Sequence, residues 1–241
     1  MLSKWKKLLI IPVLALAASP ALAHGVWLGV RCDADCLVLG DGPKDNAYDP
    51  AMVTGAKAYT TDHKETEITV IPKNDHVEFK LDDSVAIVAV NFDYGYWSRN
   101  AEGKFVNKPM TEVPGSDLGT HAVKFNVSYL KPEAKPMLVE GLDMQFVPSV
   151  NPASLNMGDA FEVQLLHNGK PMANTPVIID VINDLNGTVL TDADGKATIT
   201  VRNNALNVVG VEVAVPEQNN DKCTQTKYFA SLSFTCHPEY D

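Results

Sequence analysis

The chain has 241 residues with 30 acidic and 20 basic side chains, and its formal net charge is −10 at pH 7. This acidic balance disfavours nucleic acid and anionic membrane surfaces as partners. Hydrophobic residues make up 45% of the chain, which is the usual share for a globular protein, and its length fits one large or two ordinary domains.

The first 23 residues have the three parts of a signal peptide. Three lysines precede residue 8, residues 8–18 form an apolar run, and the Ala-Leu-Ala of residues 21–23 supplies an A-x-A cleavage site. An uncleaved anchor is the alternative, but the apolar run is short for a membrane span. We therefore expect a periplasmic protein that is peripheral to the membrane at most. Cleavage would leave 17 basic and 30 acidic residues in 218, a net charge of −13.

Short β-rich runs separated by turn signals fill the rest of the chain. VWLGV, TEITVI, VAIVAVNF and FEVQLL are examples, and several runs alternate polar and apolar residues. Frequent Gly, Pro, Asn and Asp between them are typical of β-sandwiches. We predict an all-β fold of two β-sandwich domains, with a linker near LKPEAKPMLVEG. The first domain spans residues 24–133, and the second, residues 140–241, is Ig-like or prealbumin-like.

Two dipeptides in the second half predict tight turns. Asn168-Gly169 and Asp194-Gly195 each place a glycine where a turn needs positive φ. We expect each of them to separate two strands of the C-terminal sandwich.

The chain has four cysteines, and export makes disulfides the default expectation. The most economical pairing is local, Cys32 with Cys36 and Cys223 with Cys236. Residues 33–35 would then form a tight turn whose neck is closed by the first bridge. A four-cysteine zinc site is the alternative, although neither pair has the usual C-x-x-C spacing.

No motif for a nucleophile, a P-loop, a dinucleotide fold or an H-E-x-x-H zinc site is present, so we predict no enzymatic activity. The sharpest candidate is His24, which becomes the first residue if cleavage follows Ala23. Its α-amine and ring nitrogen could then chelate one ion such as copper or nickel. Cleavage after Ala21 would instead make it the third residue, and a histidine left at a cleavage site by chance is the plain alternative.

Further candidates lie in three segments. His121 stands where a glycine-rich loop enters a strand, and the plain interpretation is a surface histidine. An aromatic cluster lies at one strand end, and an acidic loop follows LVLG; either could line a ligand site or be ordinary core and solvated loop. The residues concerned are Asp93, Tyr94, Tyr96 and Trp97 in the cluster, Asp41, Asp45, Tyr48 and Asp49 in the loop, and the further histidines His63, His76, His167 and His237.

The order of several segments resembles a known family. AHGVWL, LVLGDGPKDNAYDPAMV, VNFDYGYWSRNAEGKFVNKPMTEVPG, HAVKFNVSYL, NGKPMANTPVIIDV and TDADGKATITV follow one another over nearly the whole mature chain. They resemble an exported family of domains of unknown function. Its members are described as nickel-uptake-transporter proteins or as the periplasmic component of a cobalt/nickel transport system.

The resemblance implies a periplasmic β-sandwich protein that handles a divalent transition metal near an inner-membrane transporter. His24 matches the histidine of the pattern A-H-x-x-W, and His121 matches the histidine before the K-[YF] strand. Where the family has a histidine in Y-G-H-G, this chain reads LGDG and places Asp41 there. Because a carboxylate is a harder ligand than imidazole, the identity of the metal is open.

We therefore expect a metal-binding or delivery protein with His24, His121 and Asp41 around nickel or cobalt, with copper as a competitor. A second hypothesis is an envelope interaction module of two sandwiches in which the histidines are incidental. A third is a copper enzyme that oxidises polysaccharides through an N-terminal histidine, although the chain lacks an obvious flat aromatic face for such a substrate.

Overall fold

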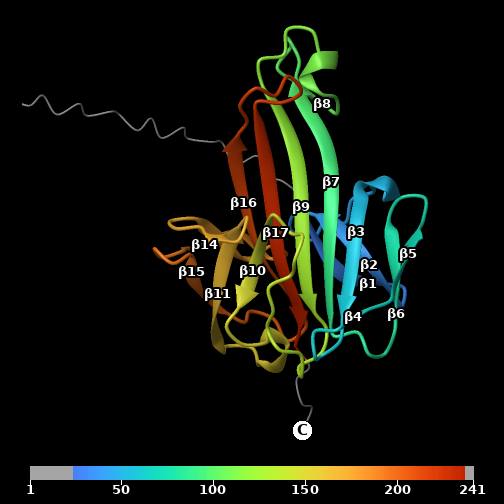
Figure 1. Ribbon diagram of the computed structural model, residues 1–241, viewed down its shortest axis with the longest axis vertical. Helices are drawn as coiled ribbons and strands as arrows, with labels where there is room; N and C mark the ends of the chain where they lie inside the picture. Colours follow the sequence, from blue (N-terminus) through green and yellow to red (C-terminus); the bar gives the residue numbers. More distant parts are fainter. Residues whose placement is uncertain (1–23, 237–241) are drawn as a thin grey trace, which may run out of the picture.

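The structure is a computed structural model that describes residues 24–236, and the predicted signal peptide and His237 lie outside the described residues. Nearly all regular structure is β-strand, so the predicted all-β fold is confirmed (Figure 1). No helix within residues 24–236 is long and apolar enough to cross a membrane. The described helices are the three short 3-10 turns η1 (Pro50–Met52), η2 (Met110–Glu112) and η3 (Pro152–Ser154).

The start of the described chain forms a small antiparallel sheet with the order β1-β2-β6-β5. Its first strand is buried on both faces near Gly25, because Val26 and Leu28 belong to one core and Trp27 to another. The bounds are β1 (Gly25–Arg31), β2 (Ala34–Gly40), β5 (Ile68–Pro72) and β6 (Val77–Leu81).

A nine-stranded sheet has the order β14-β13-β16-β17-β9-β7-β3-β4, and β8 pairs with β7. Strands β9 and β17 pair in parallel, so this sheet runs across the predicted boundary between residues 133 and 140. The division into two domains stays a prediction about folding units. The bounds are β3 (Val53–Tyr59), β4 (Glu65–Thr66), β7 (Ile87–Arg99), β8 (Phe105–Val106), β9 (Gly119–Tyr129), β13 (Pro176–Asp180), β14 (Asp184–Leu190), β16 (Leu206–Pro216) and β17 (Gln225–Thr235).

A third sheet has the order β10-β11-β12, and β15 pairs with the start of β11. The predicted turns are present: Asn168 and Gly169 have φ of 50° and 71° between β11 and β12, and Gly195 has φ of 73° before β15. The bounds are β10 (Met144–Pro148), β11 (Ala160–His167), β12 (Lys170–Pro171) and β15 (Lys196–Thr200).

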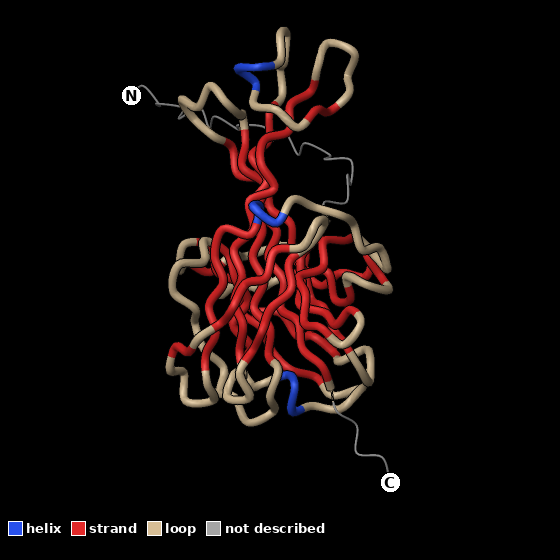
Figure 2. The backbone as a smooth tube through the Cα atoms, turned by 90° about the vertical axis from the view of Figure 1, so that its right-hand side faces the viewer, coloured by secondary structure: helices blue, strands red, loops and turns tan. Residues whose placement is uncertain are grey.

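The nine-stranded sheet is the middle of three layers (Figures 1 and 2). One core lies between it and the small sheet, where Val88, Val90 and Phe92 of β7 meet Leu37 and Leu39 of β2. The other core lies on its opposite face, against the third sheet. It includes Phe125, Val127 and Tyr129 of β9, Leu232 and Phe234 of β17, and Met144, Phe146, Val163 and Leu165 of β10 and β11.

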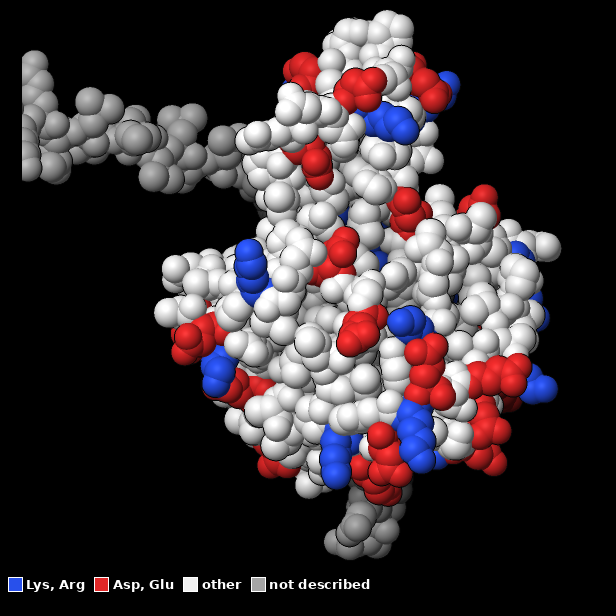
Figure 3. All heavy atoms as spheres, viewed as in Figure 1, with Lys and Arg blue, Asp and Glu red and all other residues white. Residues whose placement is uncertain are grey.

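Four strands of the middle sheet continue past the other two layers. The ends of β7, β9, β16 and β17 form a narrow projection that carries β8 and η2 at its tip (Figures 1 and 2). Figure 3 shows the molecule narrowing between this projection and the body, with acidic side chains spread over both and lysines and arginines among them. The net negative charge therefore does not gather in one patch on this face.

The predicted disulfides are not present: all four cysteines are free thiols. Cys223 and Cys236 flank β17, so their Cα atoms are roughly 40 Å apart at the rise of a strand, whereas a bridge needs less than about 7 Å. The predicted turn at residues 33–35 is also wrong. The turn is Cys32-Asp33, with φ of 49° and 65°, and β2 already begins at Ala34, which leaves Cys32 exposed and Cys36 buried.

One buried hydroxyl ties β1 to the middle sheet. Ser231 of β17 is 1% exposed, and its Oγ donates a hydrogen bond to the carbonyl oxygen of Val26. Asn126 Nδ2 donates to Ser231 Oγ at 3.0 Å, so the same hydroxyl is held from β9. This contact fixes where β1 starts relative to the sheet below it.

We expect Ser231→Ala to lower the free energy of unfolding by about 1–3 kcal/mol, because it leaves a buried carbonyl without its donor. Urea denaturation followed by circular dichroism measures this change. The control is Thr198→Ala on the exposed side of β15, which should change stability by less than about 0.5 kcal/mol. Equal stability of the two variants would show that the contact contributes nothing.

Candidate functional site

The register of β1 and β2 brings two predicted site residues together. Gly25 pairs with Gly40, so His24 and Asp41 lie opposite each other just beyond the end of the ladder. His24 Nε2 is 3.8 Å from Asp41 Oδ1, and the two side chains are 35% and 14% exposed. Two segments that the sequence placed in separate motifs thus form one site.

Both glycines are required by close contacts. A Cβ on Gly25 would lie 2.6 Å from the ring of Phe229, and one on Gly40 would lie 1.9 Å from the carbonyl oxygen of Lys44. The loop after β2 therefore folds back over the strand end. Gly42, with φ of 64°, donates its N–H to the carbonyl of Val181 at 3.1 Å, which anchors the loop to the middle sheet.

The carboxylate of Asp41 is only partly satisfied. Lys44 Nζ lies 3.4 Å from both oxygens, but Oδ1 is buried and accepts no hydrogen bond. A buried oxygen without a donor is costly unless a charged or polar group binds it. Metal–ligand bonds of about 2.0–2.1 Å hold two donor atoms between ~2.9 and ~4.1 Å apart, so the His24–Asp41 separation fits a shared cation.

A group of packed aromatic side chains lies beside His24. The ring of Tyr94 is 6.2 Å from that of His24, and Trp97 and Phe92 pack against Tyr94 at 5.2 and 6.0 Å. The register of β7 against β9 shifts between Asp93 and Gly95, and such bulges redirect side chains. The predicted aromatic cluster is thus divided, with Tyr94 and Trp97 on the His24 side.

The environment of His24 favours the neutral form of its imidazole. Burial is the main cause that lowers its pKa below 6.5, and the charges of Lys124 and Lys44 lower it further, while Asp41 acts in the opposite direction. A neutral imidazole has the lone pair that a metal ion needs, so the residue is prepared for ligation at neutral pH.

His121 lies on the other face of the middle sheet. Side chains alternate along β9, and His121 shares its face with Phe125 and Val127 of the core against the third sheet. Its Nε2 is 2.9 Å from Asp93 Oδ1, and the ring of Tyr96 stacks on it at 4.5 Å. The structure therefore does not bring His121 to His24 and Asp41.

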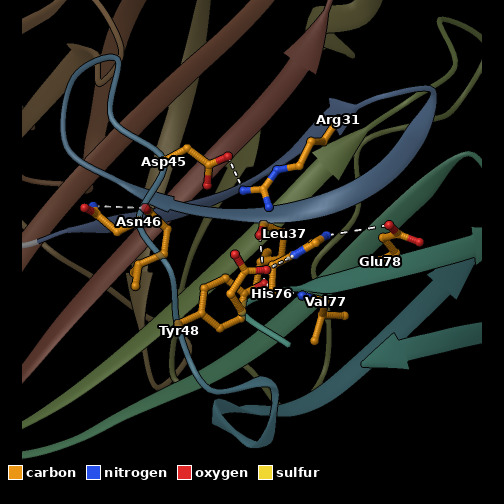
Figure 4. A network of polar contacts seen from close by, with 10 residues as sticks. Arg31, Leu37, Asp45, Asn46, Tyr48, His76, Val77 and Glu78 are labelled. Atoms are coloured by element: carbon orange, nitrogen blue, oxygen red, sulfur yellow. Dashed lines mark hydrogen bonds and ion pairs between the residues drawn. The ribbon is translucent and has the colours of Figure 1, made fainter. Parts of the chain in front are cut away.

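The rest of the acidic loop is structural. Figure 4 shows Asp45 paired with Arg31. It also shows Tyr48 beside β2, where its hydroxyl donates a hydrogen bond to the carbonyl of Leu37 at 2.8 Å. Beside it, His76 Nδ1 contacts Asp75 at 2.7 Å, and the buried Nε2 lies 3.6 Å from Glu78 Oε1. These contacts hold the loop against β2 and β6.

The remaining predicted residues contact other parts of the chain and do not approach His24. Asp49 caps η1 by accepting from Ala51 N at 2.9 Å. His63 Nε2 lies 2.9 Å from the carbonyl of Lys135, and His167 packs on Tyr228. Within the described residues no cluster of three His, Cys, Asp or Glu side chains could hold a metal ion. A cation at His24 therefore needs a donor beyond the side chains.

Sequence reasoning missed Lys124, which is 2% exposed and lies with its Nζ 5.0 Å from the Tyr94 ring centroid. In HAVKFNVSYL the polar residues alternate with apolar ones, which is the pattern of a strand with one face exposed to solvent. The signal that it is buried comes only from the layer that covers this face.

Comparison with known proteins identifies the family. Residues 36–215 match the family described as "Domain of unknown function (DUF4198)", and the chain belongs to it. An uncharacterized protein of Haemophilus influenzae is 28% identical over 196 residues, which cover 81% of this chain and 83% of that protein. No solved structure matches the chain. Asp41, His121 and Lys124 lie within the matched segment, and His24 precedes it.

We expect a two-dimensional NMR titration to give His24 a pKa below 6.5, because burial and two lysines disfavour its charged form. Asp41→Asn should lower that pKa further, since it removes the one charge that favours the imidazolium. A His24 pKa above 6.5, or a rise in Asp41→Asn, would contradict the described environment.

Proposed function

We propose that this protein is a periplasmic carrier of one divalent transition-metal ion, nickel or cobalt with copper as a competitor, and that His24 and Asp41 hold the ion. The observation that carries the proposal is the buried Asp41 Oδ1, which lies 3.8 Å from His24 Nε2 and accepts no hydrogen bond, with the exposed ammonium group of Lys44 3.4 Å away. The carrier has no catalytic role, and it passes the ion to an inner-membrane transporter.

The third donor would come from the main chain or from water. If the signal peptide is cut after Ala23, the α-amine of His24 joins Nδ1 of the same residue in a chelate ring. Asp41 then lies at Nε2, where carboxylates orient metal-bound histidines. In the other arrangement Nε2 and Oδ1 bind the ion directly, and the α-amine takes no part. Both arrangements need His24 and Asp41, and neither uses His121.

The chemistry of the donors supports a borderline metal. Imidazole and amine nitrogens favour nickel, cobalt and copper over magnesium and calcium, whereas the single carboxylate adds a harder donor. Tyr94 and Trp97 shield one side of the site from water. A neutral imidazole offers the lone pair that a metal ion needs, and the surroundings of His24 favour that form.

The test is native mass spectrometry and calorimetry on protein purified from the periplasm, with its N-terminus sequenced. We expect one bound ion per chain, loss of binding in His24→Ala, and binding at least about tenfold weaker in Asp41→Asn. His121→Ala is the matched control, since it removes a histidine from the opposite face, and it should bind within about twofold of the wild type.

An alanine inserted before His24 separates the two arrangements. It abolishes binding if the α-amine is a ligand and leaves binding intact if Nε2 and Asp41 suffice. A wild-type protein that takes up no nickel, cobalt or copper would overturn the proposal, and so would equal losses in His24→Ala and His121→Ala.

The projection of the middle sheet favours one further candidate function. Strand ends that extend past the body, with β8 and η2 at their tip, offer a surface for a protein partner in the envelope (Figure 2). A protein that binds such a partner equally well in metal-free buffer and with His24→Ala would be an interaction module rather than a metal carrier.

A further inference from the structure

A buried lysine lies next to the candidate metal site. Lys124 belongs to β9 in the middle sheet and faces the small sheet, where it is 2% exposed. Its neighbours in register are Phe92 on β7 and Phe229 on β17, and Glu212 of β16 follows Phe229 in the same row. The side chain thus points into the layer from which His24 emerges.

Aromatic rings surround the ammonium group. Lys124 Nζ is 5.0 Å from the ring centroid of Tyr94 and 5.9 Å from that of Phe229. The ring of Tyr94 also packs beside His24, with ring centroids 6.2 Å apart. The same ring therefore neighbours both the ammonium group and the imidazole.

The ammonium remains largely charged at neutral pH. Burial lowers the pKa of Lys124 to about 8, Glu212 raises it, and Lys227 lowers it. Glu212 Oε1 also forms an ion pair with Lys227 at 2.7 Å, so its negative charge is shared between two lysines. In the row, Phe229 lies between Lys124 and Glu212.

We propose that Lys124 sets the affinity of the His24–Asp41 site by repelling the bound cation, so that the ion is held weakly enough to be released. This inference rests on the proposed metal-carrier function. Two like charges interact much more strongly in a site of low dielectric constant than in water, and a divalent ion doubles the effect. A carrier needs an affinity that is high enough to bind the ion and low enough to release it, because an ion bound too tightly cannot be passed on.

The other two lysines of this region serve as built-in comparisons. Lys44 lies 3.4 Å from Asp41 but is 65% exposed, so water and salt screen its charge. Lys227 lies on the same face as Lys124, and its Nζ is paired with Glu212 at 2.7 Å. Removing each of the three charges should therefore have different effects on metal binding.

The experiment measures the dissociation constants and dissociation rates of nickel(II) and cobalt(II) for the full mature protein at pH 7.4 and fixed ionic strength. We expect Lys124→Met to bind at least about tenfold more tightly and to release the ion more slowly. Lys44→Met should bind at most about threefold more tightly, and Lys227→Met should stay within about twofold of the wild type.

Two further variants separate charge from packing. Lys124→Gln removes the charge with a polar side chain and should also tighten binding, whereas Lys124→Arg keeps the charge and should bind as the wild type does. Thermal unfolding of each variant confirms that it is folded. Folded Lys124→Met and Lys124→Gln proteins whose affinity is unchanged or weaker would overturn the inference.

If the protein is not a metal carrier, the experiment gives a different result from the one expected if only the role of Lys124 is wrong. If neither the wild type nor Lys124→Met binds nickel or cobalt, the metal-carrier function is wrong and the inference is overturned with it. If the wild type binds and the neutral variants bind equally well, only the role of Lys124 is wrong. Binding that is detected in Lys124→Met alone and is lost on adding His24→Ala supports the inference.

Discussion

The packing of β1 across the middle sheet is the constraint on which the site depends. The hydroxyl of Ser231 holds the carbonyl of Val26, and the ring of Phe229 leaves room only for a glycine at position 25. Together they fix the last residue before the ladder, so His24 has a defined position although it stands at the start of the described chain. The pairing of Gly25 with Gly40 then brings Asp41 to the same place.

The sequence predicted the all-β fold and the Asn168-Gly169 turn because alternation and turn residues are local properties. It also predicted His24 and Asp41 as site residues, but only the register of β1 and β2 shows that they meet. His121 was grouped with them on the family resemblance, and strand alternation places it on the other face of the sheet only once the layers are known. The cysteine pairing was wrong since nearness in sequence is not nearness in space along an extended strand such as β17.

Lys124 shows why the sequence pattern did not indicate a buried charge. On β9 the apolar residues Val123, Phe125 and Val127 alternate with polar ones, which is the pattern of a sheet exposed on one side. In the structure the small sheet covers that polar face, so the lysine lies among Tyr94 and Phe229 instead of in water. The same covering explains the low exposure of Asn126, Ser128 and Ser233. Burying such polar groups lowers the stability of the fold. Departures of this kind are expected at functional sites, which agrees with a functional role for the charge of Lys124.

The most direct measurement is anomalous X-ray diffraction from crystals of the mature protein grown with one equivalent of nickel(II). The proposed function predicts a single strong anomalous peak within bonding distance of Nδ1 or Nε2 of His24. A peak between His121 and Asp93, or no peak above the noise at His24, would contradict it.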